Sequence, residues 1–398
     1  GGLVGNFPFT KPSTGFNHRL PSNPPRLNCV VDGKCFFVRI FNKGRRRNMT
    51  IRYGIIGTGW ITEAFLAGAA GVPGMALRAV CSRSEERGRE FAARHGADLV
   101  FTDPARMAAS PDIDAVYIAS PNVLHAAQSR LFLENGKHVL CEKPLAARPE
   151  EVESLQALAA NRGLVYMEAI MLLHMPQLAV LEEAVGRLGR ISLAHFDFSQ
   201  LSSKYPAYLE GAALPNIFNP AMETGALMDL GVYCVYPALY LFGEPEGLTA
   251  SAVFLDSGAD GAGAAVLRYP DKVAVLTYSK TGQAVAPSQI VGDRGTLTIG
   301  SISKLEDMVL TEKGKAPERL VGEQDKAALM GYEAARFCAA VGAGDADGRM
   351  DEDSRLALRV HRCMREIRRQ AGIVFPTDRD KGEPRRRPEG LPPEDRKI

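Results

Sequence analysis

The segment IRYGIIGTGWIT, residues 51–62, is an apolar run followed by a glycine-containing turn and the start of a helical pattern. This order predicts a buried strand, a tight turn and then a helix. Glycines at such a turn let backbone N–H groups approach a dinucleotide pyrophosphate at the helix N-terminus. Thr62 occupies the third glycine position of the pattern, so a plain strand-to-helix turn is the alternative. The cofactor contacts predicted here are Gly57, Thr58, Gly59, Trp60 and Ile61.

Short apolar segments alternate with helical patterns along the first half of the body. Strands without polar alternation are typical of a parallel sheet that is covered on both faces. Right-handed crossovers then give a doubly wound α/β (Rossmann) domain, with the glycine turn after its first strand. Strands are predicted at 52–56, 76–81, 99–101, 115–119, 138–141 and 164–168. Helical patterns between them cover 84–95, 124–135 and 149–161.

The pattern changes after about residue 188. Strand-like segments joined by short turns predict an α+β domain with an open, mostly antiparallel sheet, and two helices, 326–341 and 351–370, are expected to close it. An open sheet face is a poor surface for a monomer, so we expect a homodimer or homotetramer joined through this sheet. The strand-like segments are 191–200, 248–256, 262–269, 273–280, 288–291, 296–299 and 308–311.

The two ends of the chain differ from its body in composition. Residues 1–48 carry nine Lys or Arg and a single Asp, with five prolines, and they predict a disordered basic extension. A native protein that starts at Met49 is an equally good interpretation. Residues 378–398, rich in charge and proline, predict a disordered tail. Between these ends we expect a nucleotide-binding domain at 49–170 and a substrate and oligomerisation domain at 171–377.

The composition argues against several classes of protein. The 398 residues carry 48 Lys or Arg and 46 Asp or Glu, and the basic first segment leaves the body acidic. An acidic body does not fit a nucleic-acid-binding protein. No run of eighteen apolar residues occurs, which argues against a membrane-spanning helix. Seven cysteines without a C-x-x-C pair argue against disulfides and a metal site, and favour a reducing compartment, the cytoplasm.

The end of the second predicted strand bears on the choice of cofactor. The sequence there is VCSRS, residues 80–84, and it contains no acidic residue. A carboxylate at this place would accept hydrogen bonds from the adenine ribose hydroxyls of NAD. Ser82 and Arg83 can instead hold the 2′-phosphate of NADP, and the guanidinium can also cover the adenine. We therefore predict NADP as the cofactor, with NAD as the alternative.

Other strand ends place polar residues at the edge of the sheet where open α/β sheets bind their ligands. Lys143 directly follows the fifth strand, where its charge can hold substrate and lower the pKa of a neighbouring hydroxyl. Glu142 can brace Lys143, and Glu168 can hydrogen-bond its side chain. His125 opens a helix and is as easily structural as ligand-binding. The cofactor contacts predicted at these strand ends are Ser120, Pro121, Asn122, His125, Glu142, Lys143 and Glu168.

Three motifs together resemble one protein family. They are YIASPNVLH (117–125), CEKP (141–144) and GALMDLGVY (225–233). With the glycine turn, they resemble the glucose–fructose oxidoreductase / inositol dehydrogenase / MocA (Gfo/Idh/MocA) family over about residues 51–377. The motifs are most similar to those of its dihydrodiol dehydrogenase-like branch. The resemblance implies an NAD(P)-binding domain, a second domain with an open sheet, and hydride transfer on sugars, polyols or dihydrodiols in dimers or tetramers.

The resemblance also implies roles for residues of the second domain. Asp229 and Tyr233 are four residues apart in a helical segment, so they share one face. Many family members carry His in place of Tyr233, whereas in the dihydrodiol dehydrogenase-like branch a Tyr pairs with the EKP lysine, here Lys143. Tyr233 then carries the proton, Lys143 supports it and Asp229 orients a substrate hydroxyl, with core packing as the alternative for Tyr233. Further residues expected near the pocket are His174, Lys204, Tyr205, Asn216 and Phe218.

We predict an NAD(P)-dependent oxidoreductase that passes a hydride between nicotinamide and a carbinol or carbonyl carbon of a sugar, polyol or dihydrodiol. Two alternatives on the same fold stay open. A non-catalytic NAD(P)-binding regulator would need neither Lys143 nor Tyr233. A glycosidase that uses NAD transiently would retain NAD through purification and show no net change of nicotinamide absorbance on turnover.

Overall fold

The computed structural model describes residues 50–211, 213–343 and 348–379. The extension predicted for residues 1–48, a start at Met49 and most of the expected tail therefore lie outside the described residues.

The first residues of the predicted disordered tail, 378 and 379, are helical instead. Asp378 belongs to a short helix, α11 (Pro376–Arg379), and is buried. Its carboxylate pairs with Arg368 and accepts a hydrogen bond from the backbone N–H of Phe375 at 2.7 Å. These contacts order the chain as far as Arg379, beyond the point where composition suggested that order ends.

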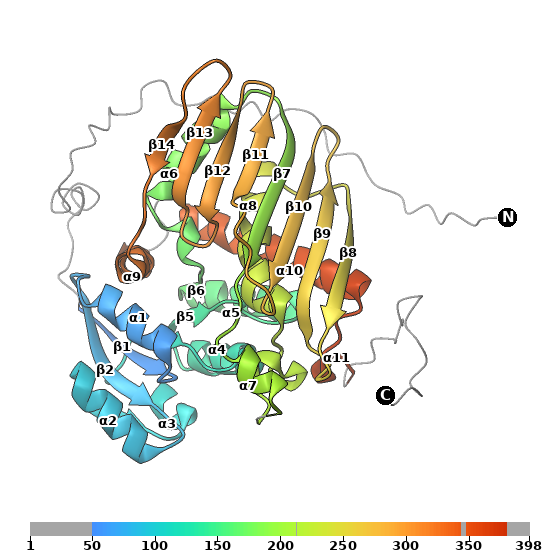
Figure 1. Ribbon diagram of the computed structural model, residues 1–398. Coiled ribbons are helices and arrows are strands. Elements are labelled where there is room, and N and C mark those ends of the chain that lie inside the picture. The colour runs from blue at the N-terminus through green and yellow to red at the C-terminus, as the bar shows by residue number, and fades with distance from the viewer. Residues whose placement is uncertain (1–49, 212, 344–347, 380–398) are drawn as a thin grey trace, which may run out of the picture. The chain divides into compact units, whose positions relative to one another are not determined.

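The first domain is a six-stranded parallel sheet with the strand order β3-β2-β1-β4-β5-β6 (Figure 1). This order reverses direction between β1 and β4, as in dinucleotide-binding Rossmann folds. The strands are β1 (Ile51–Ile56), β2 (Met75–Cys81), β3 (Leu99–Phe101), β4 (Ala115–Ile118), β5 (His138–Glu142) and β6 (Tyr166–Ala169). The helices and single turns are α1 (Trp60–Ala69), α2 (Glu85–His95), α3 (Pro104–Ala108), η2 (Asn122–Leu124), α4 (His125–Glu134), α5 (Pro149–Arg162) and η3 (Met171–Leu173).

The second domain is built on an eight-stranded sheet with the order β14-β13-β12-β11-β7-β10-β9-β8. All neighbouring strands are antiparallel except β7 and β10, which are parallel, so the expected fold class is observed. The strands are β7 (Ile191–Ser199), β8 (Gly247–Phe254), β9 (Asp260–Arg268), β10 (Val273–Ser279), β11 (Ser288–Gly292), β12 (Gly295–Ser301), β13 (Glu306–Glu312) and β14 (Glu318–Val321). The helices and turns are α6 (Gln177–Arg187), α7 (Tyr205–Leu209), η4 (Asn216–Phe218), η5 (Pro220–Met222), η6 (Leu227–Gly231), α8 (Val232–Phe242), α9 (Lys326–Ala343) and α10 (Arg349–Ala371).

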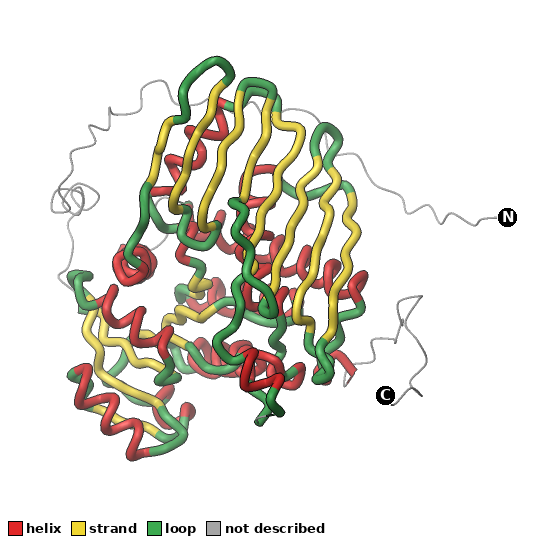
Figure 2. The backbone as a smooth tube through the Cα atoms, in the orientation of Figure 1, coloured by secondary structure: helices red, strands yellow, loops and turns green. Residues whose placement is uncertain are grey.

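Helices cover one face of the second sheet (Figure 2). Helix α6 packs on β12–β14, α8 on β7 and β10, and α10 on β8. Phe196 and Leu276 are fully buried on this face. On the opposite face, Leu193, Val266 and Val253 are 38%, 39% and 68% exposed. Within the described residues, the sheet therefore has a face with exposed apolar side chains, as the sequence predicted.

Helix α9 does not close the second sheet, so the prediction for this helix was wrong. It packs against α1 of the first domain. A Cβ on Gly68 of α1 would lie 2.6 Å from the backbone nitrogen of Gly331 on α9, so the two helices touch through glycines. A helical pattern shows that a helix forms and which side is apolar, but not which domain that side packs on.

Among the described residues, one helical run, Pro220–Phe242, is long and apolar enough to cross a membrane, since an 18-residue window in it has a mean hydropathy of 1.4. The run includes η5, η6 and α8, and 67% of that window is buried inside the protein. Such burial is characteristic of a core helix in a globular domain.

Candidate active site

The glycine turn between β1 and α1 has the geometry that a dinucleotide needs. Gly57 has a φ of +99°, and a Cβ there would collide with the carbonyl oxygen of Ala119 beyond β4. The Thr62 hydroxyl donates a hydrogen bond to the Gly57 carbonyl oxygen at 3.1 Å, so the residue in the third glycine position stabilises the turn. A Cβ on Gly59 would meet nothing within 4 Å, and Trp60 is 69% exposed. The N-terminus of α1 is thus open to a pyrophosphate.

The end of β2 also fits the predicted cofactor. Ser82 donates its backbone N–H to the Phe101 carbonyl oxygen at 3.0 Å, which fixes the turn after the strand. Arg83 is exposed, and within the described ranges no carboxylate pairs with it. A free guanidinium beside this strand end is suited to a 2′-phosphate.

His125 is structural rather than exposed to a ligand. It is 1% exposed, and its two ring nitrogens lie 2.8 Å from the carbonyl oxygens of Ser120 and Pro144. Burial lowers its pKa, so the neutral ring donates to only one of these two carbonyls. His125 thereby ties the end of β4 to the turn that follows Lys143.

The neighbours of His125 link the two domains. Pro121 precedes the turn η2, and Ser120 donates its hydroxyl to Gln128 at 2.7 Å. The side-chain amide of Asn122 donates to the carbonyl oxygen of Glu223, in the second domain, at 3.0 Å. The P-N-x-x-H segment therefore shapes the edge of the sheet and the contact between the domains.

The structure brings together the three residues that were predicted to be catalytic. Lys143 Nζ donates to the backbone carbonyl oxygen of Asp229 at 3.0 Å. The same nitrogen lies 5.3 Å from the ring centroid of Tyr233. Lys143 follows β5 of the first domain, whereas Asp229 and Tyr233 lie on η6 and α8 of the second. Among the described residues, no hydrogen bond occupies the Tyr233 hydroxyl.

The state of Tyr233 differs from the expectation. Burial, followed by the charges of Glu142 and Glu333, raises the pKa of Tyr233 well above its ordinary value. The sequence predicted Tyr233 as the proton carrier with Lys143 in support, and a neighbouring cation lowers the pKa of a hydroxyl. The raised pKa favours the protonated phenol, which can donate a proton or a hydrogen bond.

Glu142 is buried rather than solvated. It accepts a hydrogen bond from the Tyr117 hydroxyl at 2.6 Å, and burial raises its pKa. The sequence analysis missed a second carboxyl beside it, Glu333 of α9, which is 1% exposed. Burial and the charge of Glu142 raise the pKa of Glu333 well above its ordinary value. Lys326 Nζ of the same helix lies 4.1 Å from the ring centroid of Trp60, so α9 also reaches the end of the glycine turn.

Glu168 does not hydrogen-bond Lys143 as expected. One of its oxygens accepts hydrogen bonds from the Leu145 N–H at 3.2 Å and from His361 at 3.1 Å. The other oxygen accepts one from the Tyr236 hydroxyl. Glu168 is 6% exposed. Its hydrogen bonds to these partners hold the chain after Lys143 in place.

His174 lines a small internal cavity with Glu168, Tyr166 and Ser354. Burial, followed by the charges of Arg336 and Arg349, lowers the pKa of His174 to about 3. A histidine that is neutral at every physiological pH supports packing in this cavity rather than proton transfer.

The first glycine of the GALMDLGVY motif is explained by packing in the second domain. A Cβ on Gly225 would collide with the carboxylate of Asp260, which is fully buried at the start of β9. Asp260 Oδ2 accepts the backbone N–H of Leu227 at 2.7 Å and so caps the helical turn that carries Asp229. The sequence analysis overlooked Asp260 because it is distant from the motif in the chain.

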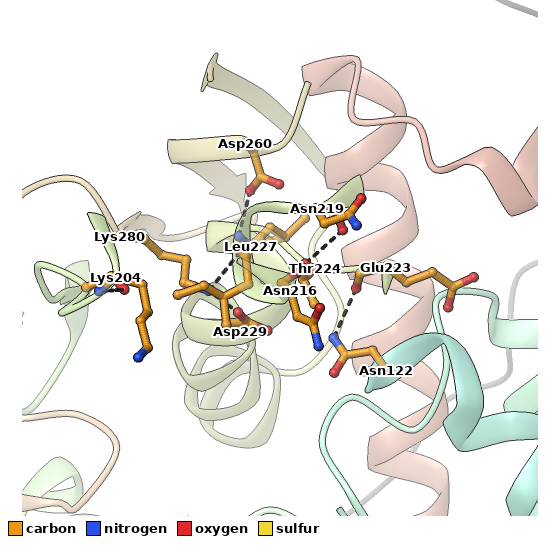
Figure 3. Close-up of polar contacts among 12 residues, drawn as sticks. Asn122, Lys204, Asn216, Asn219, Glu223, Thr224, Leu227, Asp229, Asp260 and Lys280 are labelled. Atoms are coloured by element: carbon orange, nitrogen blue, oxygen red, sulfur yellow. Dashed lines mark hydrogen bonds and ion pairs between the residues drawn. The ribbon is translucent and has the colours of Figure 1, made fainter. Parts of the chain in front are cut away.

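Lys280, which directly follows β10, is a third residue that no motif in the sequence marks. It is 5% exposed and forms an ion pair with Asp229 (Figure 3). Its Nζ also donates to the carbonyl oxygen of Ile217 at 3.2 Å and lies 5.6 Å from the ring centroid of Phe218. Tyr205 packs edge-on to Phe218 with a centroid distance of 5.9 Å.

Two other predicted pocket residues lie on the same loops. Lys204 is exposed just before α7, and its backbone N–H donates a hydrogen bond to Ser202 Oγ at 3.2 Å. The Asn216 carbonyl oxygen accepts the Thr224 hydroxyl at 2.6 Å, which closes the loop before η6.

Comparison with known proteins agrees with this geometry. The family model described as "Oxidoreductase family, NAD-binding Rossmann fold" matches residues 51–170. The model described as "GFO/IDH/MocA C-terminal domain" matches residues 183–298. The two models thus match the two domains in their order along the chain.

Several known proteins are similar along almost their whole length. An NADP(+)-dependent scyllo-inositol 2-dehydrogenase of Bacillus subtilis is 41% identical over 82% of this chain and 99% of its own. A trans-1,2-dihydrobenzene-1,2-diol dehydrogenase of Danio rerio is 29% identical over 83% of this chain and 99% of its own. A 3-ketoreductase of Actinomadura kijaniata, solved with NADP and TDP-benzene, is 28% identical over 80% and 97% of the two chains, with a TM-score of 0.70. The chain belongs to the Gfo/Idh/MocA family of oxidoreductases.

Proposed function

We propose that this chain is an NADP-dependent oxidoreductase that transfers a hydride between nicotinamide and a CH–OH carbon of a small polyol or dihydrodiol. The observation that carries the proposal is the meeting of Lys143 with Asp229 and Tyr233 across the two domains, with Nζ 3.0 Å from the Asp229 carbonyl oxygen. A regulator that only binds a dinucleotide needs no such group of acid–base residues.

The cofactor assignment rests on two features. The open N-terminus of α1 after Gly59 suits a pyrophosphate, and the unpaired Arg83 beside Ser82 suits a 2′-phosphate. The bound cofactor supplies or accepts the hydride. The similarity to an NADP(+)-dependent dehydrogenase and to a reductase solved with NADP supports the same choice.

Each residue of the central group has a separate role. Tyr233 is a partly buried phenol whose hydroxyl is available to the reacting oxygen, and it donates a proton when a carbonyl is reduced. Lys143 places a positive charge beside the Tyr233 ring and stabilises the alkoxide that develops on the substrate. Asp229 accepts a hydrogen bond from a neighbouring hydroxyl and so orients the substrate.

A panel of inositols, other polyols and trans-dihydrodiols with NADP and NAD, followed by nicotinamide absorbance, tests the function. We expect turnover with at least one polyol or dihydrodiol. Lys143→Met and Tyr233→Phe should each reduce kcat by roughly a hundredfold to ten-thousandfold, while NADP binding changes little. The double variant should be scarcely worse than the worse single variant, because the two residues act as a unit.

Tyr240→Phe is the matched control, because Tyr240 lies on the same helix and donates its hydroxyl to Glu182 at 2.5 Å. It should keep native turnover. Near-native turnover of Tyr233→Phe would show that Tyr233 only packs. NADP binding without turnover on any member of the panel would favour a regulator, and retained NAD with glycoside cleavage would favour a glycosidase.

The surroundings of the enzyme follow from the rest of the chain. The uncovered face of the second sheet, with Leu193, Val253 and Val266, supports a homodimer or homotetramer joined through this face. A location in the cytoplasm, and the absence of nucleic-acid and membrane partners, stay predictions from composition.

A further inference from the structure

We propose that Lys280 is a positioning residue for substrate recognition: it holds the Asp229 carboxylate in the orientation that receives a substrate hydroxyl, and it holds the adjoining loop at Ile217. This inference rests on the proposed function, because it extends the role assigned to Asp229. It adds a residue from the end of β10, about fifty positions along the chain from the motif that contains Asp229.

The first support is the cost of placing Lys280 where it is. The side chain of Lys280 is 6% exposed, and that of Asp229 is 17% exposed. Removing an ammonium from water is strongly unfavourable unless the ion is paired and hydrogen-bonded. Lys280 meets this condition with the Asp229 carboxylate, the Ile217 carbonyl oxygen at 3.2 Å and the face of Phe218.

The second support is that different acceptor atoms of Asp229 have different partners. Its backbone carbonyl oxygen accepts from Lys143, and its Oδ2 accepts from Lys280. Within the described part of the chain, no hydrogen bond occupies Oδ1. Lysines from both domains therefore fix the backbone and one carboxylate oxygen, while the other oxygen stays available as an acceptor.

The third support is the position of Lys280 among the loops of the second domain. Its backbone carbonyl oxygen accepts the N–H of Ser202 at 2.9 Å, at the start of the loop that leads to α7. Its side chain reaches the loop of η4 through Ile217 and Phe218. One residue thus connects both loops to Asp229, and its loss should loosen substrate binding more than cofactor binding.

These contacts also indicate the kind of substituent that is recognised. A carboxylate oxygen accepts hydrogen bonds but cannot donate them, so it selects a hydroxyl over a carbonyl oxygen or an ether. Because Lys280 offsets the charge of Asp229, the pair can recognise a neutral hydroxyl. The substrate class is a neutral compound with a free hydroxyl beside the carbon that reacts.

The test compares Lys280→Met with Lys272→Met in the full chain with NADP. The two lysines flank the same strand, because Lys272 directly precedes β10 and pairs with Asp271 instead. With a polyol that the unmodified chain oxidises, we expect Lys280→Met to raise KM by at least tenfold and to lower kcat only a few-fold. Its Kd for NADP should not change. Lys272→Met should leave all three values unchanged.

Two further variants separate positioning from general support of the fold. Lys280→Arg keeps the charge and should recover most of the lost kcat/KM. The double variant Asp229→Asn/Lys280→Met should have a KM no more than a few-fold above that of Asp229→Asn alone, because Lys280 acts mainly through Asp229 and only in part through the loops. It also leaves no unpaired charge, so it remains usable if Lys280→Met alone does not fold.

The results that overturn the proposal are distinct from those that overturn the function. A native KM in Lys280→Met, or a double variant with a much higher KM than Asp229→Asn, contradicts the role of Lys280 while turnover by the unmodified chain still supports the function. Turnover on no polyol contradicts the function itself. In that case the melting temperatures of the two single variants and the double variant still test whether Lys280 and Asp229 are energetically coupled. Additive shifts would exclude the coupling on which the proposal depends.

Discussion

Asp260 makes the stability of this protein depend on pH in an unusual direction. Its carboxyl is fully buried, and only Oδ2 has a partner, the backbone N–H of Leu227. Burial raises the pKa of Asp260 from 3.8 to about 7. Between these values the folded state holds a proton that the unfolded state releases. This contribution to stability is therefore complete below about pH 4 and is lost as the pH rises through about 7.

The size of the effect follows from the two pKa values. A difference of one pKa unit corresponds to about 1.4 kcal/mol, and the two titration curves give a loss of about 2.5 kcal/mol between pH 5 and pH 8. Asp260→Asn keeps the shape and an acceptor for the Leu227 N–H but cannot ionise. The variant should lack this loss. The native chain should therefore lose about 2.5 kcal/mol more of its free energy of unfolding than the variant when the pH rises from 5 to 8.

Urea unfolding followed by circular dichroism at pH 5, 6.5 and 8 measures this difference. Asp271→Asn is the control: Asp271 lies in a turn and a hydrogen bond from Lys272 lowers its pKa, so its carboxyl stays ionised over this range. This control should follow the native pH dependence. Parallel curves for the native chain and Asp260→Asn would refute the argument, because they would show that Asp260 is ionised in the folded protein throughout.

Three further predictions concern other parts of the chain. Arg83→Ala should remove the preference for NADP over NAD in calorimetric titrations, and tighter binding of NAD by the unmodified chain would contradict the role of this residue. Gly68→Leu should destabilise the fold by roughly 3 kcal/mol or more in urea unfolding, because its side chain would enter the backbone of α9, whereas the same change at the unobstructed Gly342 should cost far less. Light scattering at micromolar concentration should show a dimer or tetramer, and Val253→Glu with Val266→Glu on the uncovered sheet face should shift it to a monomer. A native chain that is already monomeric would exclude assembly through that face.

The first domain was largely predictable from sequence because its signals are local. The apolar run at 51–56 and the glycines after it specify a strand and a turn with little help from the rest of the chain. Observed strand limits differ from the expected ones by a few residues, for example Tyr166–Ala169 rather than 164–168. Strand β14 was missed, because only two of its four residues, Glu318–Val321, are apolar, which is too short a run to predict a strand.

The site was predictable only where a motif marks it. Lys143, Asp229 and Tyr233 lie in motifs, and the structure brings them together. Lys280 and Glu333 have no such local signal, since a single charged residue after a strand or within a helix is usually solvated. Only the packing of distant elements buries them. For Lys280, a weak signal existed: it ends the strand-like segment 273–280, where a ligand-facing charge is possible.

The charges around Tyr233 have a consequence for the direction of proton transfer. Burial is the largest cause of its raised pKa, and the carboxyls of Glu142 and Glu333 act in the same direction. Lys143 Nζ donates a hydrogen bond to the Asp229 carbonyl oxygen and lies 5.3 Å from the centroid of the Tyr233 ring. In the mechanism proposed above, a protonated phenol next to a fixed cation is prepared for carbonyl reduction, in which Tyr233 would donate and the alkoxide would form beside Lys143. Alcohol oxidation must first remove the phenol proton or pass the substrate proton to water, and for this reason its rate should rise with pH more steeply than that of reduction.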